Sequence, residues 1–366
     1  MTTLAPVTPG TKATPVRYRI AVIPGDGVGK EVTPEALSVL RSVAASIDFS
    51  LEIEEFPWGS DHYARYGEMM PADALDTLSS FDAILLGAVG SPSVADHIPV
   101  WGLVLPIRQR FDQYINLRPM RLLPGSATPL ADRAPEEVDM VCVRENSEGE
   151  YCGVGRRLDR GEKTETAEET SVFSRRGIER VARFAFELAA QRPRRQLASA
   201  TKSNALRHSM VLWDEVVAEI ALEYPSVEVT RYHVDALAAR MVTCPQTLDT
   251  IVASNLFGDI LTDLGAAITG SLGLAPSANL NPEREHPSMF EPIHGSAPDI
   301  AGRGIANPIG AIWAGAMMLD HLGESGAHDR IVAAIEAVVA AGAVRTPDLG
   351  GDATCKKLAA AIAEAL

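Results

Sequence analysis

The sequence has few cysteines, no run of basic residues and no long apolar stretch, and each shortage excludes a class of protein. Its four cysteines are scattered and never spaced C-x-x-C, which argues against a disulfide framework or a zinc site and favours a reducing, cytoplasmic compartment. With a net charge of −15 and no basic cluster, we expect neither nucleic acid nor an anionic membrane surface as a partner. No stretch approaches the roughly 18 uninterrupted apolar residues of a membrane span.

The first residues contain no apolar core of the kind found in secretory signals, so we expect no such signal here. This segment is rich in Thr and Pro, which predicts a disordered arm over residues 1–16.

Strands and helices alternate along most of the 366 residues, which suffice for two domains. The segments predicted as strands are 16–23, 51–56, 82–89, 138–145, 195–201, 227–233 and 249–254. The segments predicted as helices are 175–191, 208–223, 309–322 and 328–341. This alternation indicates an α/β fold. The polar, charged segment 150–173 lacks helical periodicity and is the best candidate for an inserted or interface segment.

The glycine-rich turn after the first strand, IPGDGVGKE, matches neither common nucleotide-binding motif. Gly25, Gly27 and Gly29 are spaced two and two, whereas a dinucleotide fingerprint requires G-x-G-x-x-G. A P-loop requires Ser or Thr after the lysine, where Glu31 stands. The segment predicts a tight strand-to-helix turn, with Thr33 as the helix N-cap and proline at the first helical position.

Asp259 and Asp263 lie four residues apart in SNLFGDILTDLG, which places both carboxylates on one face of a largely apolar helix. Two acids on a mostly buried helix need a counter-charge, and oxygen ligands without nearby Cys or His favour Mg²⁺ or Mn²⁺. The alternative is a solvated polar stripe.

Three arginines follow or precede predicted elements, in IRQRF, NLRPM and VRENS. Their planar guanidinium groups suit bidentate carboxylate recognition, although an isolated arginine is more often part of a surface ion pair. Lys202 follows another strand and has a solvated loop lysine as its alternative interpretation. The segment 290–310 is a long loop of small residues, which is typical of close approach to a ligand or of a structural loop.

These segments together resemble the β-decarboxylating dehydrogenases, the family of isopropylmalate, isocitrate, homoisocitrate and tartrate/D-malate dehydrogenases. The matching motifs are IPGDGVGKEV, LLGAVGSP, NLRP with the arginine before it, VRENSEGEY, TKSN, SNLFGDILTDLG and EPIHGSAPDIAGRGIANP. The resemblance implies a two-domain α/β fold, not a Rossmann fold, with a large mixed sheet flanked by helices. Residues 17–113 and 270–366 would form a large domain with the NAD-binding loop, and 114–269 a small domain with the dimer interface.

The resemblance also implies a role for each matched residue. Arg108, Arg118 and Arg144 match the three arginines that bind the β-carboxylate of the substrate. Tyr151 matches the general acid that protonates the enol carbon after CO₂ leaves, and Lys202 is similar to the lysine that handles the hydroxyl proton.

Asp235 matches a substrate-binding and metal-ligating residue supplied by the other subunit, beside Asp259 and Asp263 of the first. This arrangement implies a homodimer with shared active sites. The residues that fall on the NAD-contact loop are Glu291, His294, Gly295, Ser296, Ala297, Asp299, Ile300 and Asn307. The family implies NAD and Mn²⁺ or Mg²⁺ as cofactors, with a monovalent cation such as K⁺ as a further candidate, and Asp299 resembles the NAD-specific form.

The segment before Arg108 bears on the substrate. Isopropylmalate enzymes carry a glutamate seven residues before this arginine and leucines four and three before it, where this chain has Trp101, Val104 and Leu105. The Ser and Asn of isocitrate enzymes are absent as well. The sequence VWGLVLPIR resembles the tartrate/D-malate branch, so we expect oxidative decarboxylation of (R)-malate to pyruvate and CO₂, with tartrate as a further substrate. The alternatives are 3-isopropylmalate dehydrogenase and a non-catalytic regulatory paralogue.

Overall fold

One ten-stranded mixed sheet runs through the whole molecule. The computed structural model describes residues 16–366, so the predicted N-terminal arm, apart from Val16, lies outside the described residues. The strands, in the order in which they pair, are β2 (Phe49–Glu55), β1 (Val16–Gly25), β3 (Ala83–Ala88), β12 (Ser288–Pro292), β11 (Pro276–Leu280), β4 (Ile115–Arg121), β5 (Asp139–Glu145), β10 (Thr250–Ala253), β8 (Gln196–Thr201) and β9 (Glu228–His233). The pairs β12–β11, β11–β4 and β4–β5 are antiparallel and the others are parallel. The predicted α/β fold with a large mixed sheet is therefore confirmed.

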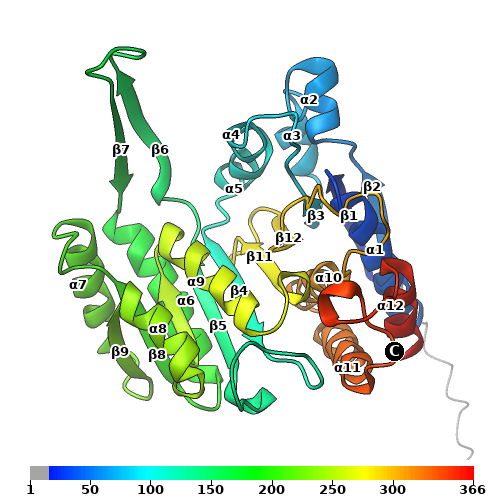
Figure 1. The fold of residues 1–366 in the computed structure, drawn as a ribbon. Helices are drawn as coiled ribbons and strands as arrows, with labels where there is room; N and C mark the ends of the chain where they lie inside the picture. Colours follow the sequence, from blue (N-terminus) through cyan, green and yellow to red (C-terminus); the bar gives the residue numbers. More distant parts are fainter. Residues whose placement is uncertain (1–15) are drawn as a thin grey trace, which may run out of the picture.

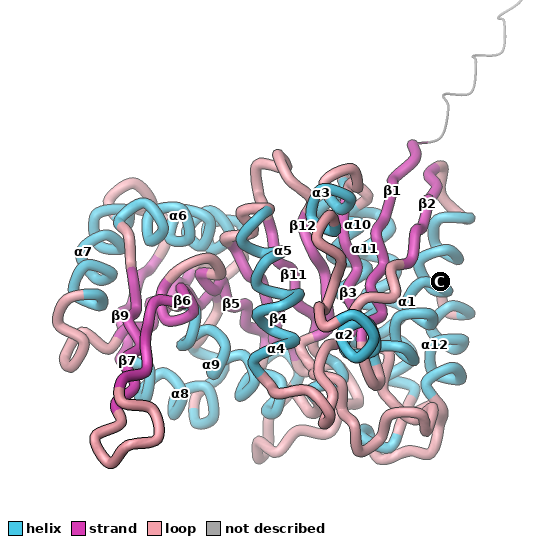
Figure 2. Tube along the Cα trace, turned by 90° about the horizontal axis from the view of Figure 1, so that it is seen from above, coloured by secondary structure: helices cyan, strands magenta, loops and turns pink. Residues whose placement is uncertain are grey.

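Helices cover both faces of this sheet (Figures 1 and 2). They are α1 (Gly29–Ala45), α2 (Ser60–Tyr66), α3 (Ala74–Leu78), α4 (His97–Pro99), the π-helical turn η1 (Val100–Val104), α5 (Leu105–Arg110), α6 (Arg175–Gln191), α7 (Ser209–Ala221), α8 (Val234–Thr243), α9 (Asn255–Ile268), α10 (Ile309–Leu322), α11 (Ser325–Ala341) and α12 (Cys355–Glu364). Helices α6 and α9 pack on opposite faces of β5 (Figure 2). Among the described residues, no helix is long and apolar enough to cross a bilayer.

The central strand β3 shows why the predicted apolar run at 82–89 is buried. Its side chains alternate between two hydrophobic clusters: Ala83 and Leu85 belong to one, and Ile84 and Leu86 to the other. A sheet covered on both faces requires an apolar side chain at every position. The two segments predicted as domains contribute five strands each to the one continuous sheet, so the division into domains stays a prediction.

Helix α1 begins earlier than predicted. The sequence predicted Thr33 as the N-cap, but the helix starts at Gly29 and Pro34 lies inside it. The glycine turn is fixed from outside, because the Asp26 amide donates to the Ala88 carbonyl at 2.7 Å and the Val28 amide donates to Ser296 O at 2.9 Å. With the turn held by these two hydrogen bonds, the helix begins directly after it. Pro34 has no N–H, so the helix lacks one intrahelical hydrogen bond there.

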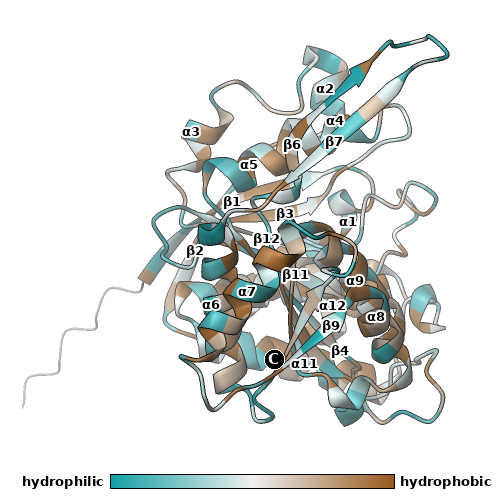
Figure 3. Ribbon diagram, turned by 90° about the vertical axis from the view of Figure 1, so that its left-hand side faces the viewer, coloured by the Kyte–Doolittle hydropathy of each residue, from teal (hydrophilic) through white to brown (hydrophobic). Residues whose placement is uncertain are grey.

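The predicted insertion 150–173 forms a β-hairpin that stands clear of the body, with hydrophilic residues at its tip (Figures 1 and 3). Strand β6 (Gly149–Leu158) pairs with β7 (Thr166–Val172), and every residue of β7 is exposed. A two-stranded hairpin without further support is only marginally stable in water. The hairpin therefore has an unpartnered surface.

Tyr18 ties the first strand to the C-terminal helices and gives a prediction about stability. Its hydroxyl lies 2.9 Å from Glu324 Oε1 and 3.2 Å from the Leu322 carbonyl oxygen. Burial and the hydrogen bond to Glu324 raise the pKa of Tyr18 to about 12. The folded state binds the phenolic proton of Tyr18 more tightly than the unfolded state, in which the pKa of tyrosine is about 10. The stabilisation by the protonated Tyr18 hydroxyl is therefore complete below about pH 10 and is lost as the pH rises toward 12.

We expect Tyr18→Phe to lower the free energy of unfolding by about 1 kcal/mol at pH 7, the typical net value of one hydrogen bond. The variant should also lose less stability than the wild type between about pH 10 and 12. Urea unfolding across that range measures both effects. The exposed Tyr66 (68% exposed) provides the control at pH 7, where Tyr66→Phe should change nothing. Equal alkaline losses in wild type and Tyr18→Phe would contradict this account.

Candidate active site

Arg144, the penultimate residue of β5, is a buried cation whose side-chain hydrogen-bond acceptors both lie on helix α9. Its side chain is only 2% exposed, and burial lowers the pKa of Arg144 to about 10. Its Nε and Nη2 donate to Asn255 Oδ1 at 3.0 and 2.8 Å, and Nη1 donates to Asp259 Oδ1. Gly258 makes this contact possible, because a Cβ there would lie 2.6 Å from the Cβ of the arginine. The helix can therefore lie directly on Arg144.

Asp259 is shared between two arginines and a tyrosine. Arg118 lies in the middle of β4, not at an element boundary as the sequence suggested, and its Nη1 is 3.4 Å from Asp259 Oδ1 and donates to Thr262 Oγ1 at 2.7 Å. Burial alone would raise the pKa of Asp259, but Arg144 and Arg118 outweigh it and hold this pKa below its usual range. The carboxylate is therefore ionised in spite of its burial.

Tyr151, in β6, donates from its hydroxyl to Asp259 Oδ2 at 3.1 Å. Its ring also lies 5.6 Å from the guanidinium carbon of Arg144, within the range of a cation–π contact. Burial, with the nearby Asp259 charge, raises the pKa of Tyr151 above its usual value. Its phenol therefore keeps its proton at neutral pH, as a general acid must.

Arg108, near the end of α5, is held by a chain of buried amides that crosses the middle of the sheet. Its Nη2 donates to Glu291 Oε1 at 2.8 Å, and Asn279 Nδ2 donates to the same oxygen at 2.8 Å. Asn279 Oδ1 in turn accepts from Asn116 and Asn146 at 2.9 and 3.0 Å. The position of one guanidinium group therefore depends on residues in β4, β11 and β12 and on the residue that follows β5.

The three arginines meet at one cavity of about 490 Å³. Residues predicted for the site that line it are Trp101, Arg108, Arg118, Arg144, Tyr151, Asp259, Glu291, His294 and Gly295. The Nε atoms of Arg108 and Arg118 are buried and have no hydrogen-bond partner within residues 16–366. Buried donors require acceptors, and the carboxylates of a small acid are acceptors of the right charge. The cavity is therefore suited to an anionic ligand.

Lys202 and Asp235 pair with each other instead of joining this cavity. Lys202 Nζ lies 2.7 Å from Asp235 Oδ2, and the hydrogen bond from the lysine holds the pKa of Asp235 below its usual range. Within residues 16–366, no three His, Cys, Asp or Glu side chains are grouped to hold a metal ion. Asp259 and Asp263 share one face of α9, as predicted, so one chain supplies two of the three predicted ligands together.

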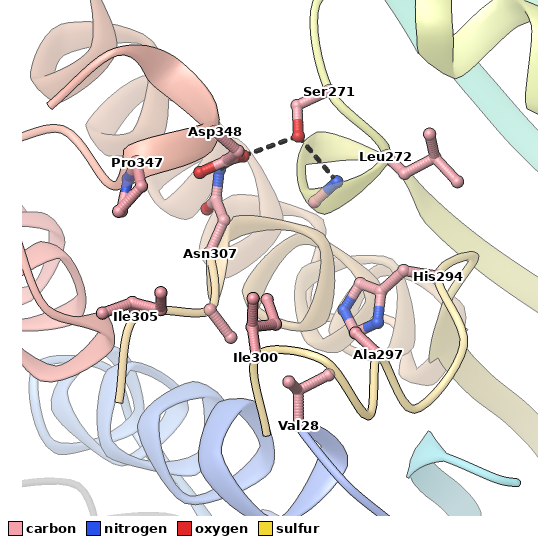
Figure 4. Close-up of a pocket in the computed structure, with 12 residues that line it drawn as sticks. Val28, Ser271, Leu272, His294, Ala297, Ile300, Ile305, Asn307, Pro347 and Asp348 are labelled. Carbon is pink, nitrogen blue, oxygen red and sulfur yellow. Dashed lines mark hydrogen bonds between the residues drawn. The ribbon is translucent and has the colours of Figure 1, made fainter. Parts of the chain in front are cut away.

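The loop after β12 forms a second cavity of about 280 Å³ (Figure 4). His294, Ala297, Ile300 and Asn307, four of the residues that the resemblance assigns to the NAD-contact loop, line it. The His294 Nδ1 lies 2.9 Å from the Gly295 carbonyl oxygen, its Nε2 is buried without a partner in the described part of the chain, and burial lowers the pKa of the ring. A neutral imidazole therefore faces this region.

The remaining residues of the loop are not gathered in this cavity. Gly295 and Ser296 line a neighbouring cleft beside the segment after β3, and Ala297 lines both this cleft and the second cavity. Asp299 is exposed and lines neither cavity nor that cleft.

Asp348 also lines the second cavity, and the sequence did not reveal it. Its Oδ2 accepts from Ser271 Oγ at 2.6 Å and from Asn307 Nδ2 at 2.9 Å, and its Oδ1 accepts from Thr346 Oγ1 at 2.5 Å. Asn307 Oδ1 accepts from the Ile309 amide at 3.0 Å, so the orientation of the Asn307 amide is fixed at both ends. Only the turn residues around Asp348 could have drawn attention to it.

Comparison with known proteins gives concordant matches along nearly the whole chain. The isocitrate/isopropylmalate dehydrogenase family matches residues 19–362. A probable tartrate dehydrogenase/decarboxylase of Agrobacterium vitis is 54% identical over 95% of this chain and 96% of its own. The D-malate dehydrogenase [decarboxylating] of Escherichia coli (strain K12) is 55% identical, covering 94% and 97%. The crystal structure of isocitrate dehydrogenase from Methylococcus capsulatus is similar with a TM-score of 0.86 at 36% identity, covering 95% of this chain and 99% of that one.

The Asp348 contacts predict a role in binding at the second cavity. Asp348→Ala removes the acceptor for Asn307 and Ser271, and we expect the affinity for NADH to fall about tenfold, the equivalent of one to two net hydrogen bonds. Titration by NADH fluorescence measures the dissociation constant. Asp352→Ala, four residues away and exposed, is the control and should bind normally. Unchanged affinity in Asp348→Ala would show that this carboxylate does not order the cavity.

Proposed function

The chain belongs to the isocitrate/isopropylmalate dehydrogenase family, and on that basis we propose that it oxidatively decarboxylates (R)-malate to pyruvate and CO₂, using NAD and Mn²⁺ or Mg²⁺. Tartrate is proposed as a further substrate. The observation that carries the proposal is the convergence of three arginines on one cavity beside Tyr151 and Asp259. Relatives with about half of their residues identical are named for D-malate and tartrate, which supports this choice of acids.

Trp101 supports a small substrate. It lines the cavity at the position, seven residues before Arg108, where an acid would be expected in an isopropylmalate enzyme. An indole there occupies volume and offers no charge, which disfavours an isobutyl-sized group. The three arginines that line the same cavity supply donors that suit the carboxylates of malate or tartrate.

The residues around Asp259 fit a divalent cation. Asp263 is exposed and has no hydrogen-bond or ion-pair partner within the described residues. Partial desolvation and the Asp259 charge outweigh the opposing effect of Arg118 and raise the pKa of Asp263 above its usual range. A hard divalent ion favours such oxygen ligands. We propose that Asp259 and Asp263 hold it together with Asp235 of the partner subunit. When bound, it supplies Lewis acidity beside the substrate hydroxyl and the adjacent carboxylate.

The protein side chains then divide the work of binding and proton transfer. Arg108, Arg118 and Arg144 bind and orient the carboxylate that leaves as CO₂. Lys202 of the partner subunit takes the proton of the substrate hydroxyl, and Tyr151 donates its proton to the carbon that lost the carboxylate. The nicotinamide of NAD supplies the hydride acceptor.

NAD is proposed over NADP because of Asp299. This exposed acid lies in the loop that lines the second cavity. A carboxylate near a ribose accepts hydrogen bonds from the diol and repels a 2′-phosphate. The proposed preference for NAD over NADP therefore rests on the negative charge of Asp299.

A homodimer with shared sites is proposed from two features of the single chain. Lys202 and Asp235 pair with each other outside the arginine cavity, although their proposed roles require them beside Asp259. The β6–β7 hairpin leaves Val154, Leu158 and Val172 exposed at 39–49%. A second copy that packs on the hairpin would bury these side chains and bring its own lysine and aspartate to the first site.

The proposed activity predicts a defined substrate profile. We expect metal-dependent formation of NADH with (R)-malate and with L-tartrate, little with 3-isopropylmalate or isocitrate, and none when EDTA is present. If 3-isopropylmalate were the best substrate, the malate assignment would be wrong within the same family. Absence of turnover with all four acids would favour a regulatory paralogue.

The shared site predicts complementation between two inactive variants. Tyr151→Phe and Lys202→Met should each be nearly inactive as homodimers. After the two are unfolded together and refolded, half of the dimers are hybrids, and each hybrid has one intact site of two. The expected activity is about a quarter of the wild-type value. No recovery in a mixture shown to contain hybrids would contradict the assignment of Lys202 to the partner's site.

A further inference from the structure

Trp101 lines both the arginine cavity and a groove along the β6–β7 hairpin. The groove has a volume of about 760 Å³, and Gly153, Gly155 and several charged residues line it as well. The Trp101 side chain is 45% exposed and projects from η1, which is π-helical. Single π-helical turns alter the direction of side chains and are frequent at functional sites. The indole therefore stands between the cavity and the groove.

The edge of this indole rests on the bare backbone of Gly153. A Cβ at that position would lie 2.5 Å from Trp101 Cη2 and 3.0 Å from Cζ3, closer than side chains pack. Gly153 has φ +74° and lies where the pairing of β6 with β7 is irregular. Such irregularities redirect the strand, and here the strand presents a glycine to the ring.

We infer that Gly153 is a specificity-determining position, which acts by seating Trp101 so that the indole closes the cavity against the hairpin groove. This inference rests on the proposed function, because it assigns the cavity to the substrate. Gly153 lines the groove but not the arginine cavity, so it acts through Trp101 as a positioning residue. The class of ligand that it excludes is a 2-hydroxy dicarboxylic acid with a branched substituent on the carbon between its hydroxyl carbon and the β-carboxylate.

The effect of a side chain at position 153 depends on which part of the Trp101 ring contacts the glycine. Cη2 and Cζ3 form the distal edge of the indole. We expect a methyl group at 153 to displace this edge from β6 and so to open a gap between the cavity and the groove. A bulky substituent could then extend into the groove, whereas malate would gain nothing from the added space.

The activity test compares Gly153→Ala with the wild type on (R)-malate and 3-isopropylmalate. We expect the ratio of kcat/KM for 3-isopropylmalate to that for (R)-malate to rise at least about tenfold, the lower end of what a few methyl groups contribute to discrimination. Trp101→Leu should raise the ratio similarly. In the Trp101→Leu background, Gly153→Ala should add no further change, because the ring that it displaces is gone.

Gly161→Ala is the matched control for backbone strain. Gly161 lies on the same hairpin with φ +88°, and a Cβ at this position would have no other atom within 4 Å. Alanine there therefore strains the backbone without touching Trp101. The substrate ratio of this variant should equal that of the wild type.

Acrylamide quenching of tryptophan fluorescence measures the exposure of the Trp101 indole and does not require turnover. The other three tryptophans, Trp58, Trp213 and Trp313, are at most 6% exposed, so a change in quenching reports mainly on Trp101. We expect Gly153→Ala to increase quenching and Gly161→Ala to leave it unchanged.

The outcomes separate this inference from the proposed function. If Trp101→Leu changes the ratio and Gly153→Ala does not, the inference is wrong and the proposed substrate stands. If the wild type turns over neither acid, the proposed function fails, and quenching decides whether Gly153 seats the ring. Unchanged quenching in Gly153→Ala overturns the inference.

Discussion

A buried guanidinium group at the end of a central strand constrains the arrangement of the site. An arginine that is only 2% exposed must be fully paired, because an uncompensated buried charge destabilises a protein by several kcal/mol. The side-chain hydrogen bonds of Arg144 all go to Asn255 and Asp259 of α9. The helix must therefore lie close against β5, which only a glycine at 258 allows. The position of the acids on α9, and with them the proposed metal ligands, follows from this contact.

The same ion pair sets the chemistry of its neighbours. Asp259 is ionised because two arginines face it, and its charge helps to keep the proton on Tyr151. The amide chain through Asn279 fixes Arg108, another residue that lines the cavity. Because these polar groups are held before any ligand arrives, little reorganisation is needed when an anionic acid binds. In the proposed function, Trp101 limits the size of that acid, so the cavity would select by both charge and shape.

Local patterns in the sequence predicted much of this fold, and long-range contacts account for what they missed. All seven predicted strands are present with ends shifted by at most two residues, because apolar runs in a doubly covered sheet are conspicuous. Of the ten strands of the sheet, β4, β11 and β12 were not predicted, because polar residues interrupt their apolar pattern: Asn116 and Arg118 in β4, Ser277 and Asn279 in β11, and Ser288 and Glu291 in β12. The start of α1 was misplaced because contacts with Ala88 and Ser296, distant in sequence, fix the turn before it. Motifs identified the arginines, Tyr151 and Asp259, whereas Asp348 and Gly153 gain their importance only from partners brought near by folding.

The proposed function requires that malate loses its remote carboxyl group, the one assigned to the three arginines, as CO₂ when it is oxidised. The most direct measurement uses (R)-malate labelled with carbon-13 only in the carboxyl group remote from the hydroxyl, with NADH and labelled CO₂ counted together. We expect one labelled CO₂ for each NADH, and unlabelled pyruvate. Label retained in the organic product, with NADH formed, would show that the enzyme oxidises malate without removing this carboxylate and would contradict the account.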